Sequence, residues 1–154
     1  MKLITAWMEV LANLGVLVGI VFLTLEVSQN TLATKSEASM AVQMAISDRI
    51  AEATINPALF DVIDKMYSDE KMTRKEELLG SFYLHGVLTA IDGALTQYSL
   101  GVIDKNVVES FDSELLMLTH QLEFGRMNWN FQGEGFSPLM QRHVADLISA
   151  YEGQ

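Results

Sequence analysis

Cysteine is absent from this chain of 154 residues, and proline occurs only twice. The first absence excludes disulfide bonds, thiol catalysis and cysteine metal sites. Two prolines and ten glycines leave little room for a long flexible linker. Strand signals are also nearly missing, because no alternating β-branched runs are bounded by hairpin turns. We therefore expect an all-α fold.

Basic residues are scarce relative to acidic ones. The chain has 10 lysines and arginines against 20 aspartates and glutamates, which gives a net charge of −10. Residues 1–35 are neutral overall, so residues 36–154 carry the whole excess of negative charge. Such a field repels phosphate backbones, and we expect no nucleic-acid partner. The sequence also lacks a Gly-rich phosphate loop, a nucleophile elbow and a zinc motif, so we infer no catalytic activity and no cofactor.

One long stretch without charge, residues 10–25, is the most informative part of the sequence. As a helix it would span roughly 24 Å, less than a bilayer core of ~30 Å. Extension back to Leu3 gives about 34 Å but brings Glu9 into the apolar region, while Trp7 indicates that headgroups are near. The weakly charged start and the lack of a directly following A-x-A site predict an uncleaved transmembrane helix over residues 1–30. A cleaved signal peptide and a soluble helix buried in an oligomer are the alternatives.

Small and polar residues share faces of this helix. Gly15 and Gly19 form a small-xxx-small pair that Ala12 extends, which favours close helix approach and therefore an oligomer interface. Glu9 and Asn13 are four residues apart on one face. Either they lie at the membrane interface, or they point inward in an oligomer and line a polar pathway.

Residues 31–154 are expected to form one acidic helical bundle of the size of a small domain. No helix breaker precedes Asn56-Pro57, so the anchor should continue as one helix to about residue 54. One face of its second half carries Leu32, Ser36, Met40, Met44 and Ala51. Thr73-Arg74-Lys75-Glu76 is a capping box, and Ser137-Pro138 is a helix start. The expected helices cover residues 31–54, 58–67, 74–100, 105–123 and 138–151.

The helix expected over residues 74–100 is nearly free of charge, with Asp92 as the only formal charge from Leu78 to Ile103. This composition favours a buried central helix, and a second membrane span is the rival. A polar stripe runs along it at Ser81, His85, Thr89, Asp92, Thr96 and Ser99. The stripe either lines a cleft or pathway, or it is satisfied by solvent and neighbouring groups. Because His85 and Asp92 are two turns apart, roughly 10 Å, a direct dyad between them is excluded.

Aromatic residues mark the segment that follows the fourth expected helix. The helical pattern breaks at Phe124-Gly125-Arg126, and we expect residues 127–136 to be a loop with Trp129 and Phe131 folded back onto the bundle. His120 and Glu123 are three residues apart, but the chain has no Glu-x-x-His motif, so no metal site is expected. His143 is expected on the surface of the last helix.

Several motifs are shared with one family of proteins. They are the N-terminal tryptophan, Gln29-Asn30-Thr31 after the apolar helix, Asn56-Pro57, Tyr98-x-x-Gly101-x-Ile103-Asp104, and Gly125-Arg126-x-x-Trp129 followed by Phe136. In these motifs the chain resembles a large bacterial family of uncharacterised single-span membrane proteins with a C-terminal helical domain. The resemblance implies a single-pass protein of the bacterial inner membrane, and it implies no activity.

Three functions follow as hypotheses. The first is a membrane-anchored helical protein in contact with lipid, which assembles with itself or serves as an accessory subunit of another membrane protein. The second is a homo-oligomeric pore lined by Glu9, Asn13 and the stripe around Asp92. The third is an enzyme or small-molecule binder that uses His85 and Asp92. Orientation in the membrane stays open, because lysines and arginines show no clear bias across the span.

Overall fold

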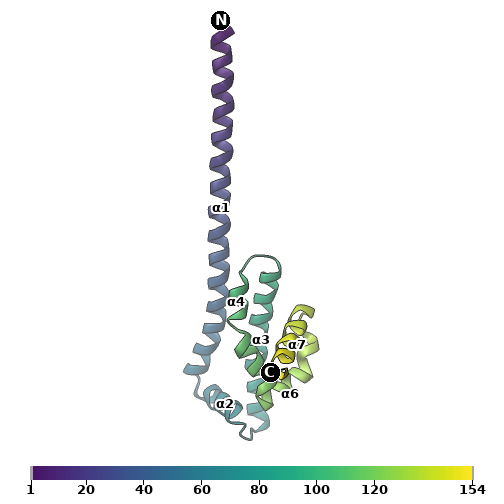
Figure 1. The fold of residues 1–154 in the computed structure, drawn as a ribbon. Helices are drawn as coiled ribbons and strands as arrows, with labels where there is room; N and C mark the ends of the chain where they lie inside the picture. The colour runs from purple at the N-terminus through teal and green to yellow at the C-terminus, as the bar shows by residue number, and fades with distance from the viewer. Residues whose placement is uncertain (1, 154) are drawn as a thin grey trace. The chain divides into compact units, whose positions relative to one another are not determined.

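The computed structural model describes residues 2–153, without the side chains of residues 2–6, 9 and 10. The described chain is helical and contains no strand, which confirms the all-α expectation. Two compact units divide it, Met1–Glu37 and Ala38–Gln154. Their boundary falls inside helix α1, which runs from Lys2 to Ile55 (Figure 1). The expected continuation of the first helix to about residue 54 is therefore confirmed.

The first unit is a helix without protein cover. All side chains of residues 11–34 are exposed. The hydroxyls of Thr24, Thr31 and Thr34 each donate to the carbonyl oxygen four residues earlier, at 2.8–3.0 Å. These bonds satisfy the hydroxyls within the helix itself. The described part of α1 is long and apolar enough to cross a membrane. None of the residues in its most apolar 18-residue stretch is buried.

The second unit begins with the last part of α1. This part packs against the core through Ala38, Val42 and Ile46. The face that carries Leu32, Ser36, Met40, Met44 and Ala51 is exposed, with Met40 at 54 % and Met44 at 59 %. This segment has apolar residues on several sides. Periodicity alone does not decide which side meets the core.

Two capped helices follow. Helix α2 (Pro57–Ser68) begins where the side-chain oxygen of Asn56 accepts backbone N–H groups of the first turn. Helix α3 (Arg74–Ser99) begins at the capping box, which is confirmed. The Thr73 N–H donates to Glu76 Oε2 at 2.7 Å, and the Glu76 N–H donates to Thr73 Oγ1 at 3.4 Å.

Helix α3 is the central helix of the second unit. By length and composition α3 could also cross a membrane, but 39 % of its most apolar 18-residue stretch is buried inside the fold. Burial against other helices favours the core-helix interpretation over a second span. Its buried residues include Leu84, Val87, Leu88, Ile91, Ala94 and Leu95.

The helix expected over residues 105–123 needs correction, because it is divided into three short segments. They are α4 (Lys105–Glu109), α5 (Asp112–Leu116) and the π-helical turn η1 (Met117–Gln121). The Phe111 N–H bonds three residues back, to the Val108 carbonyl, whereas the Leu122 N–H bonds five residues back, to Met117. The helical turn that ends at Phe111 is therefore tighter than an α-helical turn, and the turn that ends at Leu122 is wider. Apolar spacing does not reveal either change, because Val108, Leu115 and Leu118 still reach the core.

The break expected at residues 124–126 and the loop expected over residues 127–136 also need correction. Helix α6 (Glu123–Gln132) and the short 3-10 turn η2 (Gly133–Gly135) occupy these residues. A Cβ at Gly125 would lie only 2.1 Å from the carbonyl oxygen of Leu118. Glycine therefore serves the close approach of α6 to η1 and does not end a helix there.

The two aromatic residues of this segment behave differently. Trp129 is half-buried and stacks on Phe136 with ring centroids 5.6 Å apart, as expected of a side chain folded back onto the bundle. Phe131 is 91 % exposed, so the expectation that it also folds back is wrong.

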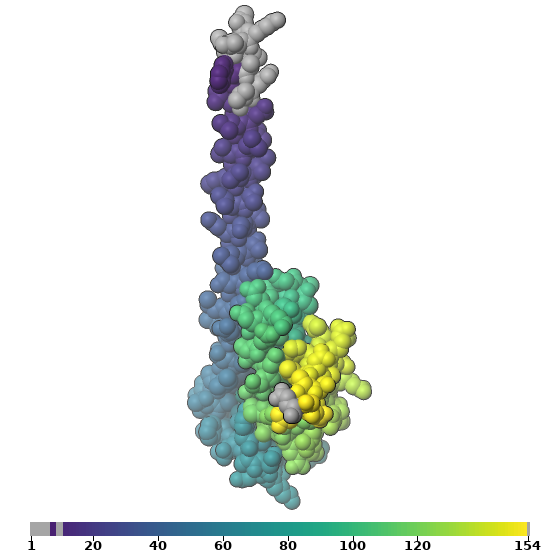
Figure 2. Space-filling model, viewed as in Figure 1, coloured from purple at the N-terminus to yellow at the C-terminus, as the bar shows by residue number. Residues whose placement is uncertain are grey.

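Helix α7 (Pro138–Glu152) closes the second unit. Ser137 Oγ accepts the Met140 N–H at 3.1 Å, which confirms the expected start. Figure 2 shows α7, in yellow, against the green segment that contains α5. His143 is not on the open surface, because its side chain is 25 % exposed and its Nε2 lies 2.7 Å from Asp112 Oδ1.

Candidate functional site

The polar stripe of α3 faces other parts of the bundle at three positions. Ser81 Oγ donates to Asn128 Oδ1 at 2.7 Å, and His85 Nδ1 lies 3.0 Å from Gln132 Oε1. Both partners belong to α6, which therefore lies along α3. The Gln132 Nε2 atom is buried and has no hydrogen-bond partner among the described residues. This part of the stripe holds two helices together.

Asp92 has a different partner, at the start of α7. The Ser137 backbone N–H donates to Asp92 Oδ2 at 3.0 Å, and Ser137 Oγ donates to Asp92 Oδ1. The same Ser137 Oγ accepts the Met140 N–H and caps α7. The carboxylate thus orients the capping residue of another helix, through hydrogen bonds to a charged acceptor, which are stronger than neutral ones.

The remaining stripe residues bond to their own helix. Thr89 donates to the His85 carbonyl at 2.7 Å, and Thr96 donates to the Asp92 carbonyl at 3.0 Å. The structure therefore brings His85 and Asp92 to different partners and not to each other. This arrangement favours neighbouring groups as the partners of the stripe, the second of the two interpretations drawn from the sequence.

The candidate residues of the first unit are exposed wherever they are described. Ala12, Asn13, Gly15 and Gly19 have no cover from the chain, and a Cβ at either glycine would meet no atom within 4 Å. The side chain of Glu9 lies outside the described residues. A polar pathway through Glu9 and Asn13 therefore stays a prediction.

Histidines also contact carboxylates at the other end of the bundle. His120 Nε2 lies 3.6 Å from Glu152 Oε1, and the His120 ring packs edge-on against Tyr151. Within the part of the chain that the structure describes, no three histidine, aspartate or glutamate side chains gather as a metal site would require.

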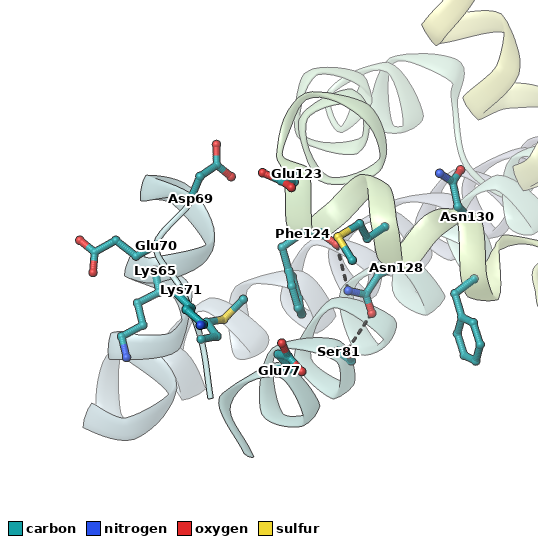
Figure 3. Close-up of a pocket in the computed structure, with 13 residues that line it drawn as sticks. Lys65, Asp69, Glu70, Lys71, Glu77, Ser81, Glu123, Phe124, Asn128 and Asn130 are labelled. Carbon is teal, nitrogen blue, oxygen red and sulfur yellow. Dashed lines mark hydrogen bonds between the residues drawn. The ribbon is translucent and has the colours of Figure 1, made fainter. Parts of the chain in front are cut away.

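A groove of about 730 Å³ lies between α2, the turn after it, α3 and α6 (Figure 3). Its volume is within the range of small-molecule sites. Sequence analysis missed it, since no motif connects segments so far apart in the chain. Its lining comprises Lys65, Asp69, Glu70, Lys71, Met72, Glu77, Ser81, Glu123, Phe124, Met127, Asn128, Asn130 and Phe131.

Hydrogen bonds already engage several polar groups around the groove. Lys65 Nζ lies 2.6 Å from Glu76 Oε1, and this contact raises the pKa of Lys65 above its ordinary value. The same lysine, with the Thr73 backbone, lowers the pKa of Glu76 from 4.5 to about 2. On the floor, Asn128 Oδ1 accepts from Ser81, and its amide nitrogen donates to the Phe124 carbonyl at 2.9 Å.

Comparisons of the chain with family models, with curated proteins and with solved structures found no match. The relationship to the bacterial single-span family therefore stays a prediction, and function is argued from the residues themselves.

Proposed function

We propose that this protein is a membrane-anchored helical assembly protein, which crosses the bacterial inner membrane once and associates with copies of itself. One observation carries the proposal. The large apolar side chains of α1 from Leu11 to Leu25 are each at least 55 % exposed. No described residue of the chain covers them.

The energetic argument for a membrane follows from this exposure. Burial of a valine, leucine, isoleucine or phenylalanine side chain stabilises by about 1.5–3 kcal/mol. Ten such side chains therefore represent roughly 15–30 kcal/mol of unrealised transfer free energy in water. Lipid supplies the apolar surroundings without a protein partner, and a helix satisfies its own backbone hydrogen bonds there. The inner-membrane location rests on the family resemblance.

Self-association is supported by the small face of the same helix. In lipid, helices gain little from apolar side chains alone, and small residues let two backbones approach closely. The open space beside Gly15 and Gly19 leaves this approach available to a second helix. A close pair of helices would be lost on adding a bulky side chain at either glycine.

The test is the mass of the full chain in a mild detergent, measured by light scattering during gel filtration. We expect an oligomer for the unaltered protein and a monomer for the double variant Gly15→Leu/Gly19→Leu. The matched control, Leu17→Phe/Val21→Phe, adds volume on the side of the helix about 160° away from the glycines, so it should leave the oligomer intact.

Each part of the proposal has its own contradicting result. Self-association would be refuted if the unaltered protein were monomeric at every concentration from roughly 1 to 100 μM, a range that tests for weak complexes. Equal dissociation by the control variant would show that the glycine face is not the interface. Release of the protein from membranes by alkaline carbonate would refute the anchor.

A further inference from the structure

The groove beside α6 combines an excess of carboxylates with an apolar floor. Asp69 and Glu70 come from the turn after α2, Glu77 from α3 and Glu123 from α6. Figure 3 shows the carboxylates of Asp69 and Glu123 pointing toward each other from two sides. Four acidic residues from three elements thus line a groove of about 730 Å³, and the Glu70 carboxylate points away from Phe124 and Glu123 (Figure 3).

Cationic groups of the lining do not offset this charge. Of the two lysines, Lys65 is held by Glu76, which is not itself a lining residue. Its ammonium points away from Phe124 and Asn128 (Figure 3). The carboxylates of Asp69, Glu77 and Glu123 are therefore opposed by the ammonium of Lys71. The carboxyl end of α2 adds a partial negative charge of its own, because the turn at Asp69 follows the last residues of that helix.

The floor of the groove is apolar and aromatic. The Phe124 ring packs so closely over Gly80 that a Cβ there would lie 3.1 Å from it. Met127, at 63 % exposure, and Phe131, at 91 %, lie at the open edge of the lining. Aromatic faces attract cations as well as apolar groups. The polar pair Ser81 and Asn128 is already hydrogen-bonded, so it offers little to an anion.

We propose that this groove binds a small organic cation with an aromatic or aliphatic body, of the arylalkylamine type. The ammonium lies between Asp69 and Glu123, and the apolar body lies on Phe124. The carboxylates favour a ligand with a positive charge, and the apolar floor favours a ligand that also has an apolar part. The proposal concerns the second unit alone, so it does not depend on self-association through α1.

The experiment uses the full chain in detergent, with phenethylamine as the probe at pH 7. Phenethyl alcohol and phenylacetate have a similar body and carry no charge or the opposite charge. Binding is followed by backbone amide shifts in an NMR titration, in which Glu123, Phe124 and Asn128 should move with one dissociation constant. We expect phenethylamine to bind about tenfold more tightly than phenylacetate, because the local potential is negative.

The amine also partitions into the detergent, and variants distinguish this partitioning from binding in the groove. Asp69→Asn/Glu123→Gln should weaken phenethylamine binding about tenfold, since two of the four carboxylates lose their charge. Asparagine is accepted in the left-handed conformation of residue 69, where φ is 52°. The control Glu134→Gln/Asp146→Asn removes the same charge at exposed positions outside the lining and should change nothing.

Four results would overturn the proposal. They are equal binding of phenylacetate, equal weakening by the control variant, shifts confined to residues outside the groove, and no binding of any probe. If dilution of the protein alone moves the groove amides, a second copy occupies the groove and the proposal fails as well. The melting temperature of each variant shows whether its second unit is folded. If the Asp69→Asn/Glu123→Gln variant is unfolded, the preference of the unaltered chain for phenethylamine over phenylacetate decides whether the proposal holds.

Discussion

Replacement of Gly125 by alanine tests the packing of α6 on the preceding π-turn. The added Cβ would lie 2.1 Å from the Leu118 carbonyl oxygen and 2.9 Å from its carbonyl carbon. Both atoms belong to the backbone, so no side-chain rotation relieves the contact. To reach an ordinary separation of ~3.2 Å between carbon and oxygen, α6 and η1 must move apart by about 1 Å.

The expected magnitude is the difference of two effects. Alanine is favoured over glycine inside a helix by about 1 kcal/mol. Overpacking in a tightly packed region costs typically 1–3 kcal/mol and occasionally more, and a clash between two backbones belongs at the upper end. We therefore expect Gly125→Ala to lower the free energy of unfolding by about 2 kcal/mol. For a domain of this size that corresponds to a fall of about 8 °C in melting temperature.

The assay is thermal unfolding in detergent, followed by near-ultraviolet circular dichroism, which reports the packing of the aromatic side chains. Gly93→Ala is the matched control, because Gly93 lies in α3 and a Cβ there would meet nothing within 4 Å. Its helix should gain about 0.5–1 kcal/mol from the same substitution. A melting temperature for Gly125→Ala equal to or above that of Gly93→Ala would refute the packing argument.

Two further predictions concern charged groups of the second unit. Glu76→Gln should lower the melting temperature at neutral pH, and its difference from the unaltered protein should shrink as pH falls from 4.5 toward about 2. The pKa of Glu76 is lower in the folded chain than its ordinary value of 4.5. The ionised carboxylate therefore stabilises the fold above that pH, and this stabilisation is lost as the pH falls toward about 2. A difference that stays constant over this range, measured in a pH series of melting curves, would contradict the assigned ion pair. Asp92→Asn should destabilise by about 1–2 kcal/mol, because one charged acceptor at the start of α7 is lost. A double-mutant cycle with Ser137→Ala checks this, and additive effects would mean that the two side chains are not coupled.

Sequence patterns predicted the helix starts well, because capping is a local matter. The Thr73 capping box and the Ser137-Pro138 start depend on atoms within four residues of each other, so the same contacts appear in the structure. The continuity of α1 was equally local, since no breaker interrupts it before Asn56-Pro57. These features needed no knowledge of the rest of the fold.

Backbone irregularities were missed for a physical reason. The turn at Phe111 and the π-turn before Leu122 change hydrogen bonding by one residue in opposite directions, so the apolar spacing continues almost unchanged. Gly125 looked like a helix end because glycine weakens helices. Its actual role depends on the Leu118 carbonyl, which only the folded chain brings against it.

The sequence by itself determined an all-helical chain, a long apolar first helix, the main helix starts and the uneven charge. Each of these follows from residue composition, spacing or contacts within a single turn. Only the tertiary structure decided which side of α1 meets the core, which partners Ser81, His85 and Asp92 bond, and that four acidic residues from distant segments line one groove. Those properties depend on which helices pack together, and several helix faces of this chain are apolar or polar enough to have packed in another way.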